Sequence, residues 1–491
     1  MILLKNKAFI ISILLWCFIT VVKIINHIPW FDEAHAWTIA EQLNLVELFD
    51  FMKIEGHTIL WYVLLMPFAK LHLGYPYSMQ FLNWVFCLIA LIIFWKKAPF
   101  DNWVKVLVTF SYPFLTIYSA YARCYAVGIM FLFMLASFYG ESLKKPVMYA
   151  ILLVLCANTS AMALIGATAF GIFFAYDFIK SKPSVKSFAC TGTVLGLGAI
   201  IILLQIVGVD DSALDSYKGI NFINDALLHD IFLKVLVKAF IFGALSIYIF
   251  VKCFKFQLRP LIFLGFTAFV MSYMFVFRFY GHYWNHAFYF IYLIIACWIG
   301  LLEKKDTNDN GLMMIFLMIV TVTQIFVPLY IKTDMLKIIF NDDGIRLSKM
   351  ILGDDNIEGK TILLANDNNA GFLLTPYGKY NVVNYCKGEK FNYDTRNYPA
   401  NNEWCKLITS TEIVDNRQKI YSVTNINLER VVSLIEGEEV YTTLPVNKLF
   451  GTDDDVKFKD VEHGNSYEFK KYKCLKLMSG QDYCLYRLIK N

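Results

Sequence analysis

Two short polar motifs lie beside apolar segments near the start of the chain. The first, FDEAHAW, spans residues 31–37 and includes Asp32, Glu33 and His35, and the second, EGHTILWY, spans residues 55–62. Ionisable groups at a membrane boundary are costly and usually functional. Asp32 can serve as a general base that takes a proton from an attacking hydroxyl. The alternative is that Asp32 caps the helix that follows by accepting its first backbone N–H groups.

The histidines of these motifs, His35 and His57, also have two interpretations. Either they hydrogen-bond to a phosphate or an acceptor group, or they simply lie at the membrane interface. The neighbouring Trp37 and Trp61 are either interfacial anchors or platforms that stack on a sugar, and the enrichment of tryptophan at membrane surfaces favours anchors.

Two groups of basic side chains could complement an anion. Arg123 lies in the motif YARCYA between two apolar segments, and Arg278, His282 and His286 accompany aromatic residues before a later apolar segment. A guanidinium keeps its charge in a low-dielectric site and can hold a phosphate with paired donors. The alternative for Arg123 is that its side chain extends to the lipid headgroups. The alternative for the cluster at 278–286 is an aromatic belt at the membrane interface with accompanying cations.

Composition sets the class of protein that carries these groups. Of the 491 residues, 57% are hydrophobic and only 17% are charged, whereas soluble domains carry about 25% charged residues. The net charge is a modest +5, without the basic stripe that indicates nucleic-acid binding. We therefore expect membrane lipids, and no nucleic acid, among the partners.

Apolar segments recur along the first two thirds of the chain. A membrane span needs about 20 apolar residues. The candidates are 8–28, 57–73, 77–95, 103–121, 124–140, 147–161, 162–179, 187–209, 231–251, 260–279, 284–302 and 311–331. The sequence predicts an all-α polytopic membrane domain over 1–331, with about 11–13 transmembrane helices and a first external loop at 28–56.

Positive charge orients this domain. Lysine-rich segment ends mark the cytoplasmic side. They are Lys5 and Lys7, Lys96 and Lys97, Lys144 and Lys145, 180–186, 252–259, and Lys304 and Lys305. The opposite ends, including the acidic loop 210–230, then lie outside together with the tail. Loop 28–56, Arg123 and the 278–286 cluster share that outer side.

One segment conflicts with this alternation. If 57–73 and 77–95 both cross, Lys96 falls on the outer side. Either 57–73 is a re-entrant or interfacial helix, or a further span exists.

The remaining residues, 332–491, predict a small soluble α/β or α+β domain. Strand-like segments at 361–364, 380–385, 405–408 and 474–478 alternate with turns, and 428–436 favours a helix. Four cysteines in this tail allow three disulfide pairings or free thiols. They are Cys386, Cys405, Cys474 and Cys484. The segment 366–369 lacks the ligand spacing of a calcium site, so we expect a turn there.

The order FDEAHAW, EGHTILWY, YARCYA and GHYWNHAFYF resembles the multi-spanning GT-C glycosyltransferases, and more narrowly their bacterial branch related to protein O-mannosyltransferases and aminoarabinose transferases. The resemblance covers 1–331 in outline. It implies an inverting transferase that moves a sugar from a polyprenyl phosphate to a hydroxyl or amine outside the membrane. Two departures stand out: Thr58 replaces a proline that often follows the histidine, and Asn285 stands where relatives carry an arginine.

The resemblance also implies a set of site residues. Asp32 and Glu33 are the catalytic carboxylates. Arg123, Arg278, His282 and His286 bind the donor phosphate, and His35, Glu55, His57 and Tyr125 support the site or bind the acceptor. No metal is obligatory, although the carboxylates and histidines leave a divalent ion as an option. The expected partners are a lipid-linked sugar and an envelope glycan, lipid or protein acceptor.

The expected location is the bacterial inner membrane, with the site and the tail extracytoplasmic. The alternative function is a transporter of a lipid or polymer precursor, whose ionisable residues would lie near the middle of the bilayer.

Overall fold

The computed structural model describes most of the chain in two compact units. Described residues are 7–55, 57–206, 257–278, 282–303, 311–330, 343–364, 371, 373–384, 389–390, 409–415, 418–424, 440–442, 455–460, 466–476 and 482–490. The first, here the helical unit, comprises Met1–His27, Leu43–Phe68 and Tyr77–Tyr330; the second, the sheet unit, comprises Ile28–Gln42, Ala69–Pro76 and Ile331–Asn491. The division at 330 lies next to the predicted one, but part of the predicted external loop, 28–42, groups with the C-terminal residues.

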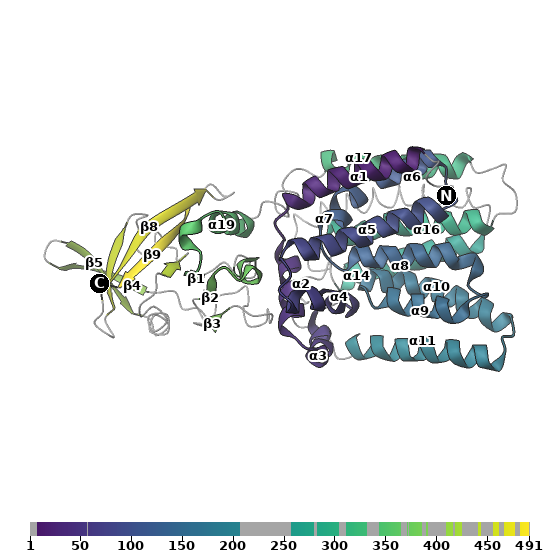
Figure 1. Cartoon of the computed structure of the whole chain (residues 1–491), viewed down its shortest axis with the longest axis horizontal. Coiled ribbons are helices and arrows are strands. Elements are labelled where there is room, and N and C mark those ends of the chain that lie inside the picture. The colour runs from purple at the N-terminus through teal and green to yellow at the C-terminus, as the bar shows by residue number, and fades with distance from the viewer. Residues whose placement is uncertain are drawn as a thin grey trace. The chain divides into compact units, whose positions relative to one another are not determined.

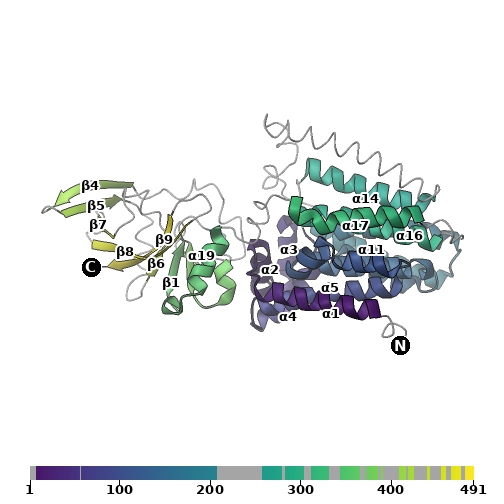
Figure 2. The ribbon, with the colours of Figure 1, turned by 90° about the horizontal axis from the view of Figure 1, so that it is seen from above.

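The long helices of the helical unit run side by side (Figures 1 and 2). Its elements are α1 (Lys7–Ile25), α3 (Leu45–Glu55), α4 (Leu60–Lys70), α5 (Tyr77–Lys97), α6 (Asn102–Thr109), the π-helix η2 (Pro113–Ile117), α7 (Tyr118–Ala120), α8 (Tyr125–Phe138), the 3₁₀-helix η3 (Tyr139–Glu141), α9 (Pro146–Ala157), α10 (Ala161–Lys180), α11 (Val185–Ile206), α14 (Leu258–Phe277), α15 (Tyr283–His286), α16 (Phe288–Glu303) and α17 (Gly311–Tyr330).

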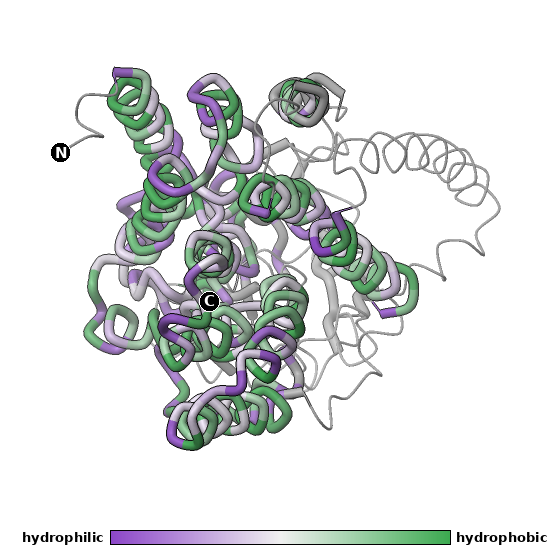
Figure 3. The backbone as a smooth tube through the Cα atoms, turned by 90° about the vertical axis from the view of Figure 1, so that its right-hand side faces the viewer, coloured by the Kyte–Doolittle hydropathy of each residue, from purple (hydrophilic) through white to green (hydrophobic). Residues whose placement is uncertain are grey.

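Six of the described helices are long and apolar enough to cross a membrane, as expected of a polytopic membrane protein. They begin at Lys7, Tyr77, Ala161, Val185, Leu258 and Tyr283. Seen along the bundle, the helices are mostly hydrophobic (Figure 3). The described residues contain fewer candidate spans than the 11–13 transmembrane helices that the sequence predicts. The predicted span 231–251 and the predicted loop 210–230 lie outside the described residues.

The structure favours one answer to the conflict over 57–73. Helix α4 has 11 residues, or about 16 Å of length, which is too short for a hydrocarbon core of about 30 Å. Helices α1 and α5 are antiparallel, because Phe9 lies 5.6 Å from Trp95 between ring centroids and Gln80 Nε2 donates to His27 O at 3.0 Å. Lys97 therefore lies at the same end as Lys7, as the alternation of charge requires when α4 does not cross.

A polar clamp joins four elements at the Lys97 end of the helical unit. Arg259 at the start of α14 donates to both carboxylate oxygens of Asp177 near the end of α10, at 2.6 and 2.9 Å. Its Nη1 also donates to Tyr139 Oη at 2.9 Å and lies 3.4 Å from Glu303 Oε1 at the end of α16. Tyr139 donates in turn to Glu303 at 2.8 Å. The clamp fixes these helix ends relative to one another.

The sheet unit is built on one mixed sheet. Among the described residues its elements are α2 (Phe31–Gln42), α19 (Asp343–Leu352), η5 (Asp355–Ile357), β1 (Thr361–Leu364), η6 (Thr375–Tyr377), β2 (Asn381–Asn384), β3 (Glu389–Lys390), β4 (Thr409–Asp415), β5 (Gln418–Thr424), β6 (Val440–Thr442), β7 (Val456–Asp460), β8 (Ser466–Lys476) and β9 (Asp482–Lys490). The strand order is β3-β2-β1-β6-β9-β8-β7-β5-β4. β1 pairs in parallel with β2 and β6, whereas β8 is antiparallel to β7 and β9.

The core of the sheet unit lies between α19 and the sheet. Leu347 and Ile351 are four residues apart on α19, so they share a helix face, and they pack with Ile362 of β1. Phe31 of α2 packs against this same cluster. The predicted strands at 361–364, 380–385 and 474–478 correspond to β1, β2 and the end of β8, whereas the segments 366–369, 405–408 and 428–436 lie outside the described residues.

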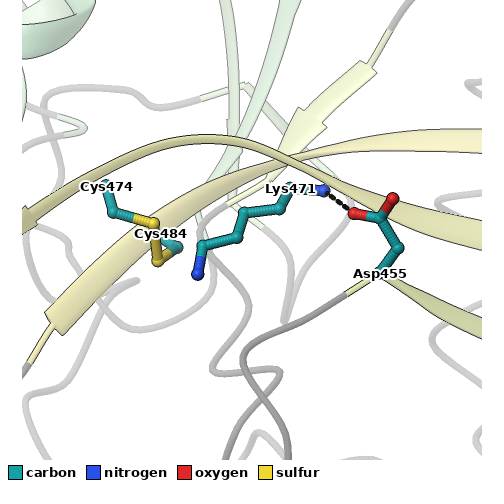
Figure 4. Close-up of a disulfide and its surroundings, with 4 residues drawn as sticks. All are labelled: Asp455, Lys471, Cys474 and Cys484. Atoms are coloured by element: carbon teal, nitrogen blue, oxygen red, sulfur yellow. Dashed lines mark hydrogen bonds between the residues drawn. A yellow bond between two sulfur atoms is a disulfide. The ribbon is translucent and has the colours of Figure 1, made fainter.

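One disulfide is present among the pairings and free thiols that the sequence leaves open. Cys474 of β8 and Cys484 of β9 are directly opposite in the antiparallel register and are bonded, with Cα atoms 4.0 Å apart (Figure 4). The pairing follows from the strand register, because residues directly opposite each other on antiparallel strands have neighbouring side chains. Nearby, the Lys471 N–H donates to Asp455 Oδ1 at 2.7 Å. Cys386 and Cys405 lie outside the described residues.

Loss of the clamp should weaken the helical unit. We expect Arg259→Met to lower the free energy of unfolding by about 2 kcal/mol, because hydrogen bonds to a charged partner are each worth roughly 1.5–3 kcal/mol. Thermal unfolding of purified protein in detergent, followed by helical circular dichroism, measures the loss. The control is Lys144→Met, whose partner Glu141 lies 3.9 Å away on the exposed surface and should matter little. Equal melting temperatures for the two variants would contradict this role.

Asp354 should make the stability of the sheet unit depend on pH. Burial raises the pKa of this carboxyl, but hydrogen bonds from Tyr472, Lys473 and Asn356 outweigh it and hold the pKa below its ordinary value. The resulting stabilisation is complete above about pH 4 and is lost as the pH falls through the lower pKa of the folded state. The melting temperature of Asp354→Asn should therefore fall below that of the unsubstituted protein at pH 6, and the difference should shrink at pH 3. A difference that stays constant would refute this.

Candidate functional site

Arg123 lies in a tight turn between α7 and α8, at the His27 end of the helical unit. The turn forms because α7 stops at Tyr121, whose backbone is extended, and the Arg123 N–H donates to Tyr121 O at 2.9 Å. The side chain is only 4% exposed. A buried guanidinium cannot lose its proton and is expensive without a counter-charge. The position therefore requires an anion nearby.

Glu55 supplies a negative charge from the end of α3. Its Oε1 lies 3.5 Å from Arg123 Nη2, and its side chain is 10% exposed. Tyr62, on the first turn of α4, donates its hydroxyl to the same oxygen at 2.5 Å. Three elements thus meet at one carboxylate oxygen, although Glu55 and Arg123 are 68 residues apart in sequence.

Tyr125 connects Arg123 to two other motifs. It opens α8, its ring lies 5.9 Å from that of His57 in an edge-on arrangement, and Asn285 Nδ2 donates to its hydroxyl at 3.1 Å. Tyr121 packs on Trp284 with ring centroids 4.8 Å apart. The short helix α15 therefore lies against the turn that carries Arg123.

The cations of the 278–286 cluster lie around α15. His282 is the N-cap residue of α15, where its ring stacks on Trp284 at 4.6 Å, and Arg278 is the C-cap residue of α14. His286 is exposed and packs on Phe275 of α14, 4.2 Å between centroids. It is Asn285, rather than His286, that makes the described hydrogen bond to Tyr125.

The remaining predicted residues lie in the sheet unit, on the first turns of α2. Glu33 is fully buried and its Oε2 accepts the Trp30 N–H at 2.7 Å. This is half of a capping box, so the capping role considered for Asp32 belongs at least in part to Glu33. Asp32 is half-buried in the same turn, and the buried His35 ring stacks on Phe31 at 5.7 Å. Asp32 therefore remains the better candidate for a base.

The structure thus gathers Glu55, His57, Arg123 and Tyr125 in the helical unit. It adds Tyr62, which was not predicted as a site residue although it lies within the second motif. Within the described residues, no group of three or more His, Cys, Asp or Glu side chains could hold a metal ion.

Comparison with known proteins does not assign the chain to a family. No protein-family model matches it. No curated protein matches it either.

The Glu55–Arg123 pair should behave as a coupled unit. We expect Glu55→Gln and Arg123→Gln each to lower the melting temperature, because each leaves a buried charge without its partner. The double substitution should be less destabilising than the sum of the two, with a coupling of about 1–3 kcal/mol. Thermal unfolding in detergent of the unsubstituted protein, the two single variants and the double variant gives this double-mutant cycle. Strict additivity would mean that the two side chains do not interact.

Proposed function

We propose that this protein is an inverting glycosyltransferase of the membrane. It moves a sugar from a polyprenyl-phosphate donor to a hydroxyl or amine of an envelope acceptor on the outer side. The observation that carries the proposal is the buried Arg123, held at one end of an apolar helical unit by Glu55. Around it lie His57 and Tyr125, from the motifs that resemble GT-C enzymes.

Arg123 suits a lipid-linked phosphate for physical reasons. Its guanidinium offers several N–H donors in one plane, which matches the geometry of phosphate oxygens. A low-dielectric setting strengthens its attraction for an anion. The apolar helices beside it are a suitable surface for a polyprenyl chain.

The chemistry needs a single displacement. The acceptor oxygen or nitrogen forms a bond to the anomeric carbon while the bond from that carbon to the phosphate oxygen breaks. The electron pair leaves with the polyprenyl phosphate, whose negative charge Arg123 stabilises. The acceptor gives up a proton to a base on the opposite face of the sugar, which inverts the anomeric carbon.

Asp32 is the proposed base. It lies beside Glu33, but Glu33 is buried and caps α2, so the half-buried Asp32 has the better access to an acceptor. A carboxylate in this role contributes about 10²–10⁴-fold to the rate. Cations of the second cluster, Arg278 and His282, are proposed to assist with the donor phosphate.

The proposed location is the bacterial inner membrane, with the site and the sheet unit extracytoplasmic. The Cys474–Cys484 disulfide supports this, because disulfides persist in oxidising compartments such as the periplasm. The clustering of lysines near the opposite end of the helical unit supports the same orientation.

The test is donor consumption in the absence of a gradient. Purified protein in detergent, given a panel of polyprenyl-phosphate sugars and an acceptor extract, should release polyprenyl phosphate. Activity confined to sealed vesicles with a gradient would favour the transporter instead. Donor that stays intact in both settings would overturn the proposed function.

Asp32→Asn should abolish most of this turnover. We expect kcat to fall by about 10²–10⁴-fold with little change in donor affinity, because the substitution removes the base but not Arg123. The matched control is Asp50→Asn, an exposed carboxylate on α3 that pairs with Lys53 at 3.2 Å. Near-normal kcat in Asp32→Asn would show that another group accepts the proton.

A further inference from the structure

The start of α4 is held by two residues that are distant in sequence. A helix leaves its first backbone N–H groups without partners inside the helix. Here the Ile59 N–H donates to Gln205 Oε1 at 2.8 Å, and the Leu60 N–H donates to Asn158 O at 2.9 Å. The Thr58 hydroxyl donates to Ala157 O at 3.4 Å.

The two amides also fix each other. Gln205 Nε2 donates to Asn158 Oδ1 at 3.0 Å and to Ile201 O at 2.9 Å, while Asn158 Nδ2 donates to Val154 O at 2.9 Å. Both side chains are buried. Rotating either amide would break bonds in the low-dielectric interior, where an unmade hydrogen bond is costly. Gln205 and Asn158 thus form a rigid amide bracket.

The bracket is tied to the helix that follows Arg123. A Cβ atom at Gly128 of α8 would lie 2.9 Å from Thr159 Oγ1 and 3.0 Å from Ala163 Cβ, so the turn after α9 packs directly on α8. Gly128 is one turn beyond Tyr125. The bracket and Arg123 therefore share the N-terminal part of α8 as their support.

The bracket acts on the site through Tyr62. Tyr62 lies three residues after Ile59, and its hydroxyl donates to the Glu55 oxygen that faces Arg123. A shift in the start of α4 would move this hydroxyl and release Glu55. Gln205 and Asn158 act on the site only through α4 and Tyr62 in this path.

We propose that Gln205 and Asn158 are positioning residues: they hold the start of α4 so that Tyr62 keeps Glu55 against Arg123. The geometry of the donor-phosphate site then depends on the last turn of α11, a helix whose outer surface is largely exposed. The effect on catalysis rests on the proposed function, but the effect on the site's geometry does not.

The first test reads the geometry without activity. Cys124 is buried beside Arg123, and Cys297 is buried in α16. The full-length protein in membranes is treated with N-ethylmaleimide, and labelling at each cysteine is measured by mass spectrometry. In Gln205→Leu we expect Cys124 to react at least about tenfold faster, as the loss of about 1.4 kcal/mol implies, while Cys297 stays protected.

Two variants control for general loosening. Thr267→Val removes a buried hydroxyl on α14 that bonds only within its own helix among the described contacts, and should leave Cys124 protected. Gln205→Glu keeps an oxygen for the Ile59 N–H and should give an intermediate rate. If Gln205→Leu exposes both cysteines, Gln205→Glu decides: selective exposure of Cys124 supports the proposal, and equal exposure of both overturns it. Unchanged protection of Cys124 in Gln205→Leu also overturns it.

The second test uses turnover. Gln205→Leu and Tyr62→Phe should each raise KM for the lipid-linked sugar, and the double variant should resemble the larger single effect because both act through Glu55. Additive effects would contradict a shared path. If the unsubstituted protein consumes no donor, the proposed function fails while the labelling test still decides the positioning role.

Discussion

The candidate site depends on the need to neutralise one buried positive charge. Arg123 is almost wholly buried at a helix junction, where its charge cannot be removed by deprotonation. Glu55 and Tyr62 meet this need from α3 and α4, two short helices of 11 residues each. The start of α4 is in turn held by hydrogen bonds to Asn158 and to Gln205 at the end of α11.

The helical unit handles charge differently at its two ends. At the Lys97 end, Arg259 makes close hydrogen bonds with Asp177 and joins Tyr139 and Glu303, a dense arrangement suited to holding helices together. At the His27 end, the contact between Arg123 and Glu55 is longer, at 3.5 Å. A longer contact is easier for a competing phosphate to replace, which is why the proposed chemistry belongs at this end.

Periodicity and apolar length made part of the fold predictable. The long apolar segments, the strands at 361–364 and 474–478, and the non-crossing alternative for 57–73 could all be derived locally, because hydrophobic patterns and charge report burial directly. Tyr62, Asn285 and Gln205 could not be found this way. Asn285 and Gln205 act through contacts across 160 and 146 positions of the chain. Tyr62 lies only seven positions from Glu55, but its role depends on the fold that brings Arg123 to the same oxygen. The motif containing Glu33 was recognisable, but its capping bond to Trp30 depends on backbone geometry that spacing alone does not give.

The most direct measurement is a structure of the full-length protein in lipid nanodiscs with a non-transferable polyprenyl-phosphate sugar. We expect the lipid phosphate to lie against the guanidinium of Arg123, with the Glu55 carboxylate displaced from its present position or sharing the guanidinium with the phosphate. A phosphate bound at another site, with the Arg123–Glu55 contact intact, would contradict the assignment of Arg123 as the donor-binding residue.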